Sequence, residues 1–235
     1  MIMFDMIGLD ADDTLWHNET IFSLTQDKFK RLLSPYHSAE WIDQRLFATE
    51  MRNLEYFGYG IKGFTLSMIE TAIELTEGRI QGSEIQMIID FAREMRRTPV
   101  QLLEHVQEVV TTLAQHYPLM LITKGDLLDQ ESKIAQSGLA DYFRHIEIMS
   151  AKTEPTYAAL LAKYGIPSER FLMIGNSLKS DILPVVALGG HAVHIPYHIT
   201  WSHEVIADTA SRSQEYATLE HIGLLPALVE QMQHR

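Results

Sequence analysis

The chain has 235 residues, 46% of them hydrophobic and 21% charged, which suits one large domain or a core with an inserted subdomain. It contains no cysteine, which excludes disulfides, thiolate metal sites and a cysteine nucleophile, and which fits a reducing compartment. The formal net charge of −12 argues against nucleic acid or an anionic membrane as a partner, because both select basic surfaces.

The segment 1–5 lacks the basic start of a secretory signal. No apolar run approaches the roughly 20 residues that a membrane-spanning helix needs. We therefore expect a cytoplasmic protein without a membrane partner.

A nearly continuous apolar run over residues 4–10 predicts a strand that is covered on both faces. Residues 18–97 then predict helices only. Apolar positions recur there at helical spacing in four segments, 21–33, 39–56, 64–77 and 83–97, with Ser83 as the expected N-cap of the last. Proline and glycine breaks separate the segments. We expect 18–97 to be a helical subdomain inserted after the first strand.

From residue 100 onward, helices and strands alternate. The expected helices are 100–116, 127–137, 156–164, 180–188 and 224–232. The expected strands are 118–122, 145–149, 171–174, 191–195 and, more weakly, 216–219. This alternation predicts an α/β fold with a Rossmann-like parallel sheet that carries helices on both faces, plus the all-helical insertion.

Polar residues follow several of these strands directly. The first strand ends in Asp10, Asp12 and Asp13, and crowded carboxylates of this kind repel one another unless they share a cation or a proton. The later strands are also followed by polar or charged residues: Thr123 and Lys124, Lys152, and Asn176 and Ser177 with Asp181 just beyond. Ligands of open α/β sheets bind at the carboxyl ends of strands, so we expect these side chains to converge on one site.

In these motifs the sequence resembles the haloacid dehalogenase-like (HAD) superfamily. Asp10-Ala-Asp12-Asp13-Thr14-Leu15 is similar to its first motif, and Gly175-Asn176-Ser177 with Asp181 is similar to its fourth. Thr123 and Lys152 match the second and third motifs, and all four come in family order. The resemblance implies a core of 1–17 and 98–235 and a C1-type helical cap of 18–97.

The resemblance also implies a Mg²⁺-dependent phosphatase that acts on a small phosphorylated metabolite. Asp10 would be the nucleophile that forms an aspartyl-phosphate, and Asp12 the general acid and base. The implied Mg²⁺ ligands are the Asp10 and Asp181 carboxylates, the Asp12 carbonyl and Asn176. The implied phosphate-binding residues are Thr123, Lys124 and Lys152.

Two positions depart from the family pattern. Asn176 stands where many relatives have Asp, so we expect somewhat weaker Mg²⁺ binding. Lys124 follows Thr123 where relatives often have Asn, and it could either contact phosphate or face solvent. In the expected cap, the glycine-rich break around 55–64 offers Tyr56 and Lys62 as substrate-contacting residues, or aromatic residues that only pack between helices.

Other functions stay open at this point. Dehalogenases of this kind usually lack the second Asp, a phosphonatase would need a cap lysine such as Lys62, and a catalytically weak binding protein could keep the same fold. The histidines of the last third, His191, His194, His198, His203 and His221, are expected to be structural or on the surface. Neither the substrate nor the choice between monomer and homodimer follows from the sequence.

Overall fold

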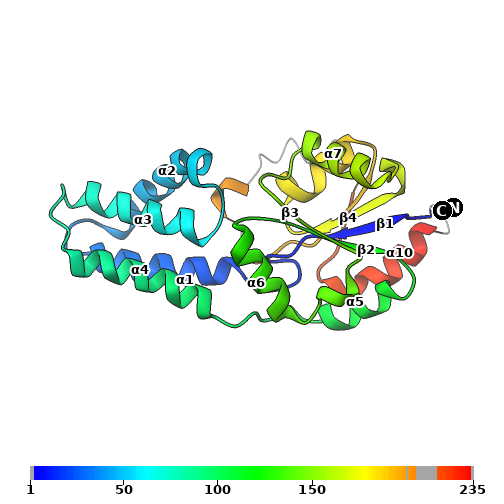
Figure 1. Ribbon diagram of the computed structural model, residues 1–235, viewed down its shortest axis with the longest axis horizontal. Coiled ribbons are helices and arrows are strands. Elements are labelled where there is room, and N and C mark those ends of the chain that lie inside the picture. Colours follow the sequence, from blue (N-terminus) through cyan, green and yellow to red (C-terminus); the bar gives the residue numbers. More distant parts are fainter. Residues whose placement is uncertain (1–2, 200, 205–215, 234–235) are drawn as a thin grey trace. The chain divides into compact units, whose positions relative to one another are not determined.

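The computed structural model describes residues 3–199, 201–204 and 216–233. One compact unit contains a parallel sheet of six strands in the order β3-β2-β1-β4-β5-β6 (Figure 1). The strands are β1 (Met6–Leu9), β2 (Leu119–Lys124), β3 (His145–Met149), β4 (Phe171–Gly175), β5 (His191–His194) and β6 (Ala217–Thr218). The chain runs outward from β1 to β3 and then returns to the other side of β1 with β4, which creates a switch point between β1 and β4.

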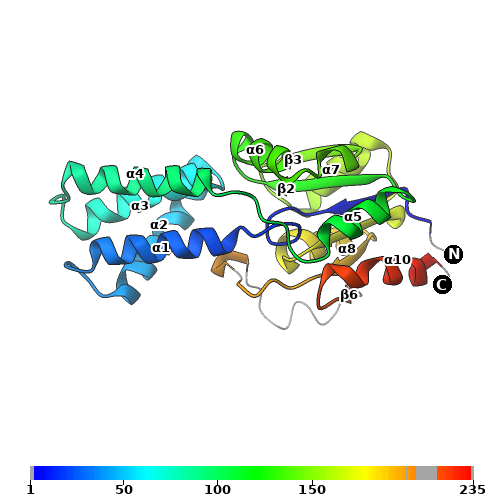
Figure 2. The ribbon, with the colours of Figure 1, turned by 90° about the horizontal axis from the view of Figure 1, so that it is seen from below.

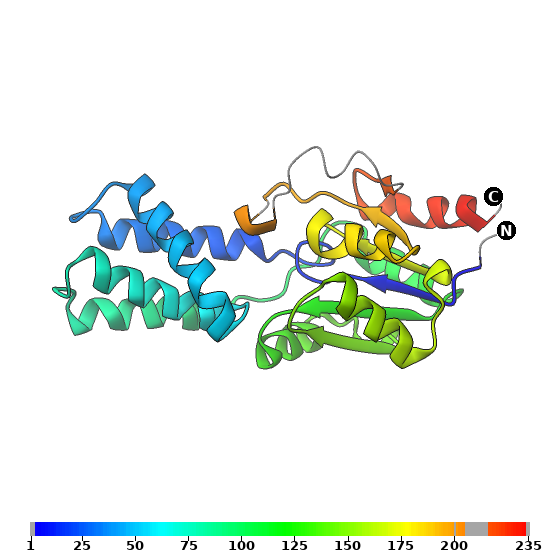
Figure 3. The same cartoon turned by 90° about the horizontal axis from the view of Figure 1, so that it is seen from above.

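Side chains of the central strands alternate between two apolar layers. Ile7 and Leu9 face α5 (Val106–Ala114), α10 (Leu225–Gln233) and the second half of α6 (Leu127–Ser137). Met6 lies in the opposite layer with α7 (Glu154–Tyr164) and α8 (Leu183–Ala187). Figure 2 shows α5 and α10 in front of the sheet, and Figure 3 shows the opposite side. The predicted α/β sheet with helices on both faces is confirmed.

The second compact unit is helical and comprises residues 20–99 and 125–132. It contains α2 (Ala39–Phe57), α3 (Ile61–Leu75), α4 (Gly82–Arg97) and nearly all of α1 (Glu19–Leu33). Its own apolar core includes Phe29, Leu46 and Met68. Gly58 ends α2 with a positive φ of 66°, a conformation that favours glycine.

Three predicted elements differ in detail. The helix expected from residue 100 begins only at Val106, because residues 101–103 instead exchange backbone hydrogen bonds with residues 15–17. The N-cap of α4 is Gln81 rather than Ser83. Gln81 and Glu84 form a capping box there. The helix expected at 180–188 starts with a π-helical turn, Leu178–Ile182, before α8. Among the described residues, no helix is long and apolar enough to cross a membrane.

Candidate active site

The carboxyl ends of three adjacent strands bring the predicted site residues together. β1 pairs with β2 on one side and β4 on the other, and the Asp10 N–H extends the pairing by donating to the Ile174 carbonyl at 2.9 Å. Asp10 therefore lies between Thr123, at the end of β2, and Asn176, just after β4. This is the strand edge at which α/β folds bind ligands.

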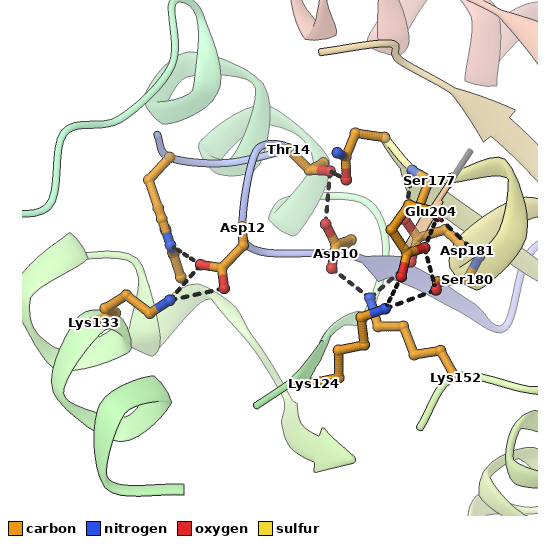
Figure 4. Close-up of polar contacts among 12 residues, drawn as sticks. Asp10, Asp12, Thr14, Lys124, Lys133, Lys152, Ser177, Ser180, Asp181 and Glu204 are labelled. Carbon is orange, nitrogen blue, oxygen red and sulfur yellow. Dashed lines mark hydrogen bonds and ion pairs between the residues drawn. The ribbon is translucent and has the colours of Figure 1, made fainter. Parts of the chain in front are cut away.

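Lys152 joins the two buried carboxylates of the site (Figure 4). Its Nζ lies 2.7 Å from Asp181 Oδ1 and donates also to Asp10 Oδ1. Burial raises the pKa of Asp10 to about 7, Asp181 adds to the rise, and Lys152 opposes it. Burial alone would lower the pKa of Lys152, but the Asp10 and Asp181 charges outweigh it and raise that pKa. Two carboxylates against one ammonium give this cluster a formal charge of −1.

The loop after β4 fixes Asp181 and Asn176. Asp181 Oδ2 accepts a hydrogen bond of 3.0 Å from the Ser177 N–H. Thr14 Oγ1 donates to Asp10 Oδ2 at 2.9 Å and lies 3.4 Å from Asn176 Oδ1, so one hydroxyl links the two. Gly175 is required for this packing, since a Cβ there would lie 2.3 Å from Asp181 Oδ2.

Asp12, the predicted acid and base, is held from two sides. Lys133 Nζ lies 2.7 Å from Asp12 Oδ1 and 2.8 Å from Oδ2. The indole N–H of the fully buried Trp16 donates to Asp12 Oδ1 at 2.7 Å. Figure 4 shows the Asp12 carboxylate turned toward Lys133 rather than toward Asp10.

Asp13 serves the backbone of the same loop. It has a positive φ of 61°, and its carboxylate accepts hydrogen bonds from the N–H groups of Asn18 and Glu19, at the start of α1. Burial raises the pKa of this carboxyl to about 7, against the effect of these two bonds. This carboxylate therefore caps the N-terminus of α1.

Lys124 forms an ion pair with Glu204, which lies in the 3₁₀ turn η4 (Ser202–Glu204). Lys124 also donates to Ser180 Oγ at 2.9 Å. The Ser177 and Ser180 hydroxyls donate to the second oxygen of Glu204. Burial would raise the pKa of Glu204, but Lys124 and the serines lower it to about 2. Lys124 is thus paired inside the protein, and its contact with phosphate stays a prediction.

The two predicted cap residues belong to the helical unit. Tyr56 is exposed, and Lys62 pairs with Asp126 at 2.8 Å, within the same unit. Their contact with a substrate stays a prediction.

Histidines form no metal centre in the described ranges, where no three His, Asp or Glu side chains are arranged to hold an ion. His194 Nε2 donates to the Asn176 carbonyl at 3.0 Å and so supports the loop after β4, while His191 packs edge-on against Phe4. His203 lies beside Lys179, and His221 beside His105.

Several residues that contact the predicted ones were not predicted from the sequence, Ser180 among them. Lys133 and Glu204 lie far along the chain from their partners and match no motif. Trp16 could have been found from the sequence, because a buried indole normally has a hydrogen-bond acceptor and Asp12 lies only four residues earlier in the same loop.

The parallel sheet and the acidic site at its carboxyl edge define the class of protein as an α/β protein with a Rossmann-like core, and comparison with known proteins gives its family. A profile described as haloacid dehalogenase-like hydrolase matches residues 4–189. The chain belongs to the haloacid dehalogenase-like hydrolases. A search of curated proteins finds no match.

Solved structures agree with this family. A haloacid dehalogenase-like family hydrolase from Xanthomonas campestris has 43% identity and a TM-score of 0.87, over 98% of this chain and 92% of that one. L-2-haloacid dehalogenase from Xanthobacter autotrophicus shares the fold at 15% identity and a TM-score of 0.67, over 98% and 100%. A magnesium-bound HAD-hydrolase structure from Bacillus subtilis shares it at 14% identity and a TM-score of 0.67, over 97% and 99%.

Proposed function

We propose that this hydrolase is a Mg²⁺-dependent phosphatase that cleaves a small phosphomonoester through an aspartyl-phosphate on Asp10. The observation that carries the proposal is the second carboxylate, Asp12, held by Lys133 and Trp16 two residues after Asp10. A phosphate ester needs a group that protonates its leaving oxygen. Displacement of a halide needs none.

In the first step an Asp10 carboxylate oxygen attacks phosphorus, and the bond from phosphorus to the leaving oxygen breaks. Asp12 gives its proton to that oxygen, so a neutral alcohol departs. The buried Thr123 hydroxyl and the Lys152 ammonium hold the equatorial phosphoryl oxygens, where negative charge is concentrated.

In the second step Asp12, now a carboxylate, takes a proton from an attacking water. The water oxygen bonds to phosphorus, and the bond to Asp10 breaks. Inorganic phosphate leaves, and Asp10 returns as a carboxylate. One residue therefore serves as acid and then as base, which balances the protons over the cycle.

The donor atoms of the site fit Mg²⁺, which prefers oxygen ligands. The Asp10 and Asp181 carboxylates, the Asn176 amide oxygen and the Asp12 backbone carbonyl would hold the ion, with water and phosphate completing the shell. The cluster of Asp10, Asp181 and Lys152 has a net charge of −1, and the pKa of Asp10 is raised. A bound cation would offset this negative charge. When bound, the ion neutralises phosphate charge and keeps Asp10 ionised.

The alternatives find less support. Asp12 argues against dehalogenation, although a dehalogenase shares the fold. A phosphonatase needs an activated lysine, which burial or a second cation provides. Lys62 is instead 65% exposed and paired with Asp126. A binding protein without catalysis would have no need for the buried Asp10, Lys152 and Asp181 cluster.

We further propose that the helical unit is the cap that selects the leaving group, with Tyr56 and Lys62 as its substrate contacts. The function is tested by measuring phosphate release from phosphorylated metabolites and chloride release from 2-chloropropionate, with and without Mg²⁺. We expect phosphate release that depends on Mg²⁺, and no chloride. Chloride release without phosphate release would make the enzyme a dehalogenase.

A further inference from the structure

The carboxylate of Asp12 is held by two neighbouring side chains that have no role in the proposed chemical steps. Lys133, in the second half of α6, contacts both carboxylate oxygens at 2.7 and 2.8 Å. Trp16 donates to one of them at 2.7 Å. Lys133 also donates to Asn18 Oδ1 at 3.1 Å, which fixes the ammonium in turn.

These contacts lie in a sheltered place. The side chains of Lys133 and Asp12 are only 15% and 21% exposed, so solvent screens their attraction less than it would on an open surface. Bonds between charged groups are also shorter and stronger than neutral ones. An ammonium on both oxygens and an indole on one restrict both side-chain torsions of Asp12.

From this geometry we infer that Lys133 is a positioning residue that sets the orientation of Asp12 for proton transfer. The inference rests on the proposed function, because it assigns Asp12 the role of acid and base. Lys133 acts through the Asp12 carboxylate, whose oxygens it contacts, and not on the substrate itself. Its effect comes from preorganisation, since a carboxyl group already held in place does not lose torsional freedom when the reaction begins.

Loss of Lys133 should therefore reduce turnover rather than substrate binding. Proton transfer by a positioned side chain contributes about 10²- to 10⁴-fold, and a mobile Asp12 would lose part of that. For Lys133→Met we expect kcat on an alkyl phosphate to fall about tenfold or more, with KM unchanged. The fall on p-nitrophenyl phosphate should be smaller, because that leaving group departs without a proton.

A double-mutant cycle separates positioning from general damage. If Lys133 acts through Asp12, Lys133→Met should lower kcat no further in an Asp12→Asn background. Lys133→Arg, which keeps the charge, should recover part of the loss. Lys163→Met is the matched control, because Lys163 pairs with Glu147 on an exposed part of the same unit and should retain wild-type kcat. An equal fall in both backgrounds, or no fall in wild type, would overturn the inference.

A crystal structure of Lys133→Met tests the same point without any assay. We expect more than one conformer of Asp12 there, and a single unchanged Asp12 orientation would contradict a positioning role. Should Lys133→Met fail to fold, Lys133→Gln, which can still donate one hydrogen bond, replaces it in both experiments. Wild-type enzyme that releases no phosphate would refute the proposed function, and the crystallographic comparison would still decide the role of Lys133.

Discussion

Lys152 Nζ lies 2.7 Å from Asp181 Oδ1, and both side chains are 1% exposed. An ion pair buried this deeply is costly to break, because removal of one partner leaves the other charge without compensation. Lys152 also binds Asp10, so it holds together carboxylates that come from two different strand ends.

Lys152→Met should destabilise the protein by about 3–5 kcal/mol, since two buried carboxylates then face each other without a cation. Mg²⁺ should restore part of this loss if it binds the same carboxylates. Calorimetric unfolding with and without Mg²⁺ measures both effects. Lys163→Met, which removes a 58% exposed lysine from its pair with Glu147, should leave the midpoint near that of wild type. Unchanged stability of Lys152→Met would contradict the importance of the buried pair.

Gly175→Ala should displace Asp181, because the added Cβ would lie 2.3 Å from Asp181 Oδ2 and 2.4 Å from its Cγ. We expect Mg²⁺ affinity to fall by about tenfold or more, which is roughly 1.4 kcal/mol. Isothermal titration with Mg²⁺ gives the value. Gly82→Ala is the control, because a Cβ at Gly82 meets nothing within 4 Å. Equal Mg²⁺ affinities of the two variants would show that Asp181 does not bind the ion.

Asn176→Asp should tighten Mg²⁺ binding, because it adds a negative charge to the proposed ligand set. One negative charge about 4 Å from a divalent ion contributes about 2 kcal/mol in a watery environment, which corresponds to roughly 30-fold in affinity. A Mg²⁺ titration of the variant beside wild type measures the change. Affinity that stays the same or weakens would remove Asn176 from the metal site.

Much of this arrangement could be predicted from the sequence. Apolar strands that end in Asp10, Thr123 and Asn176 fix a shared sheet edge, because parallel strands all present their carboxyl ends on one side. The partner of Lys124 could not be predicted, since Glu204 lies 80 residues away and no local spacing connects the two. The start of α5 could not be predicted from the apolar pattern of residues 100–103. The same pattern suits a helix and an extended segment, and these residues pack on the core in the extended form.

Glu204→Gln should destabilise the protein in a pH-dependent way. The folded pKa of Glu204, about 2, lies below its ordinary value of 4.5, so the carboxylate stabilises the fold above pH 4.5. That contribution, of order 3 kcal/mol, is lost as the pH falls from 4.5 toward 2. Denaturant unfolding across this window should therefore show the difference from wild type shrinking. Glu169→Gln, at an exposed position, is the control. A difference that stays constant across the window would contradict the ion pair with Lys124.

In the proposed mechanism, Asp10 carries the phosphoryl group. The most direct measurement is an acid quench of the enzyme during turnover of p-nitrophenyl phosphate with Mg²⁺, followed by mass spectrometry of the peptide that contains Asp10. We predict one added phosphoryl group on that peptide, which disappears in Asp10→Asn and without Mg²⁺. Mg²⁺-dependent turnover that persists in Asp10→Asn, with no phosphorylated peptide in wild type, would contradict the account.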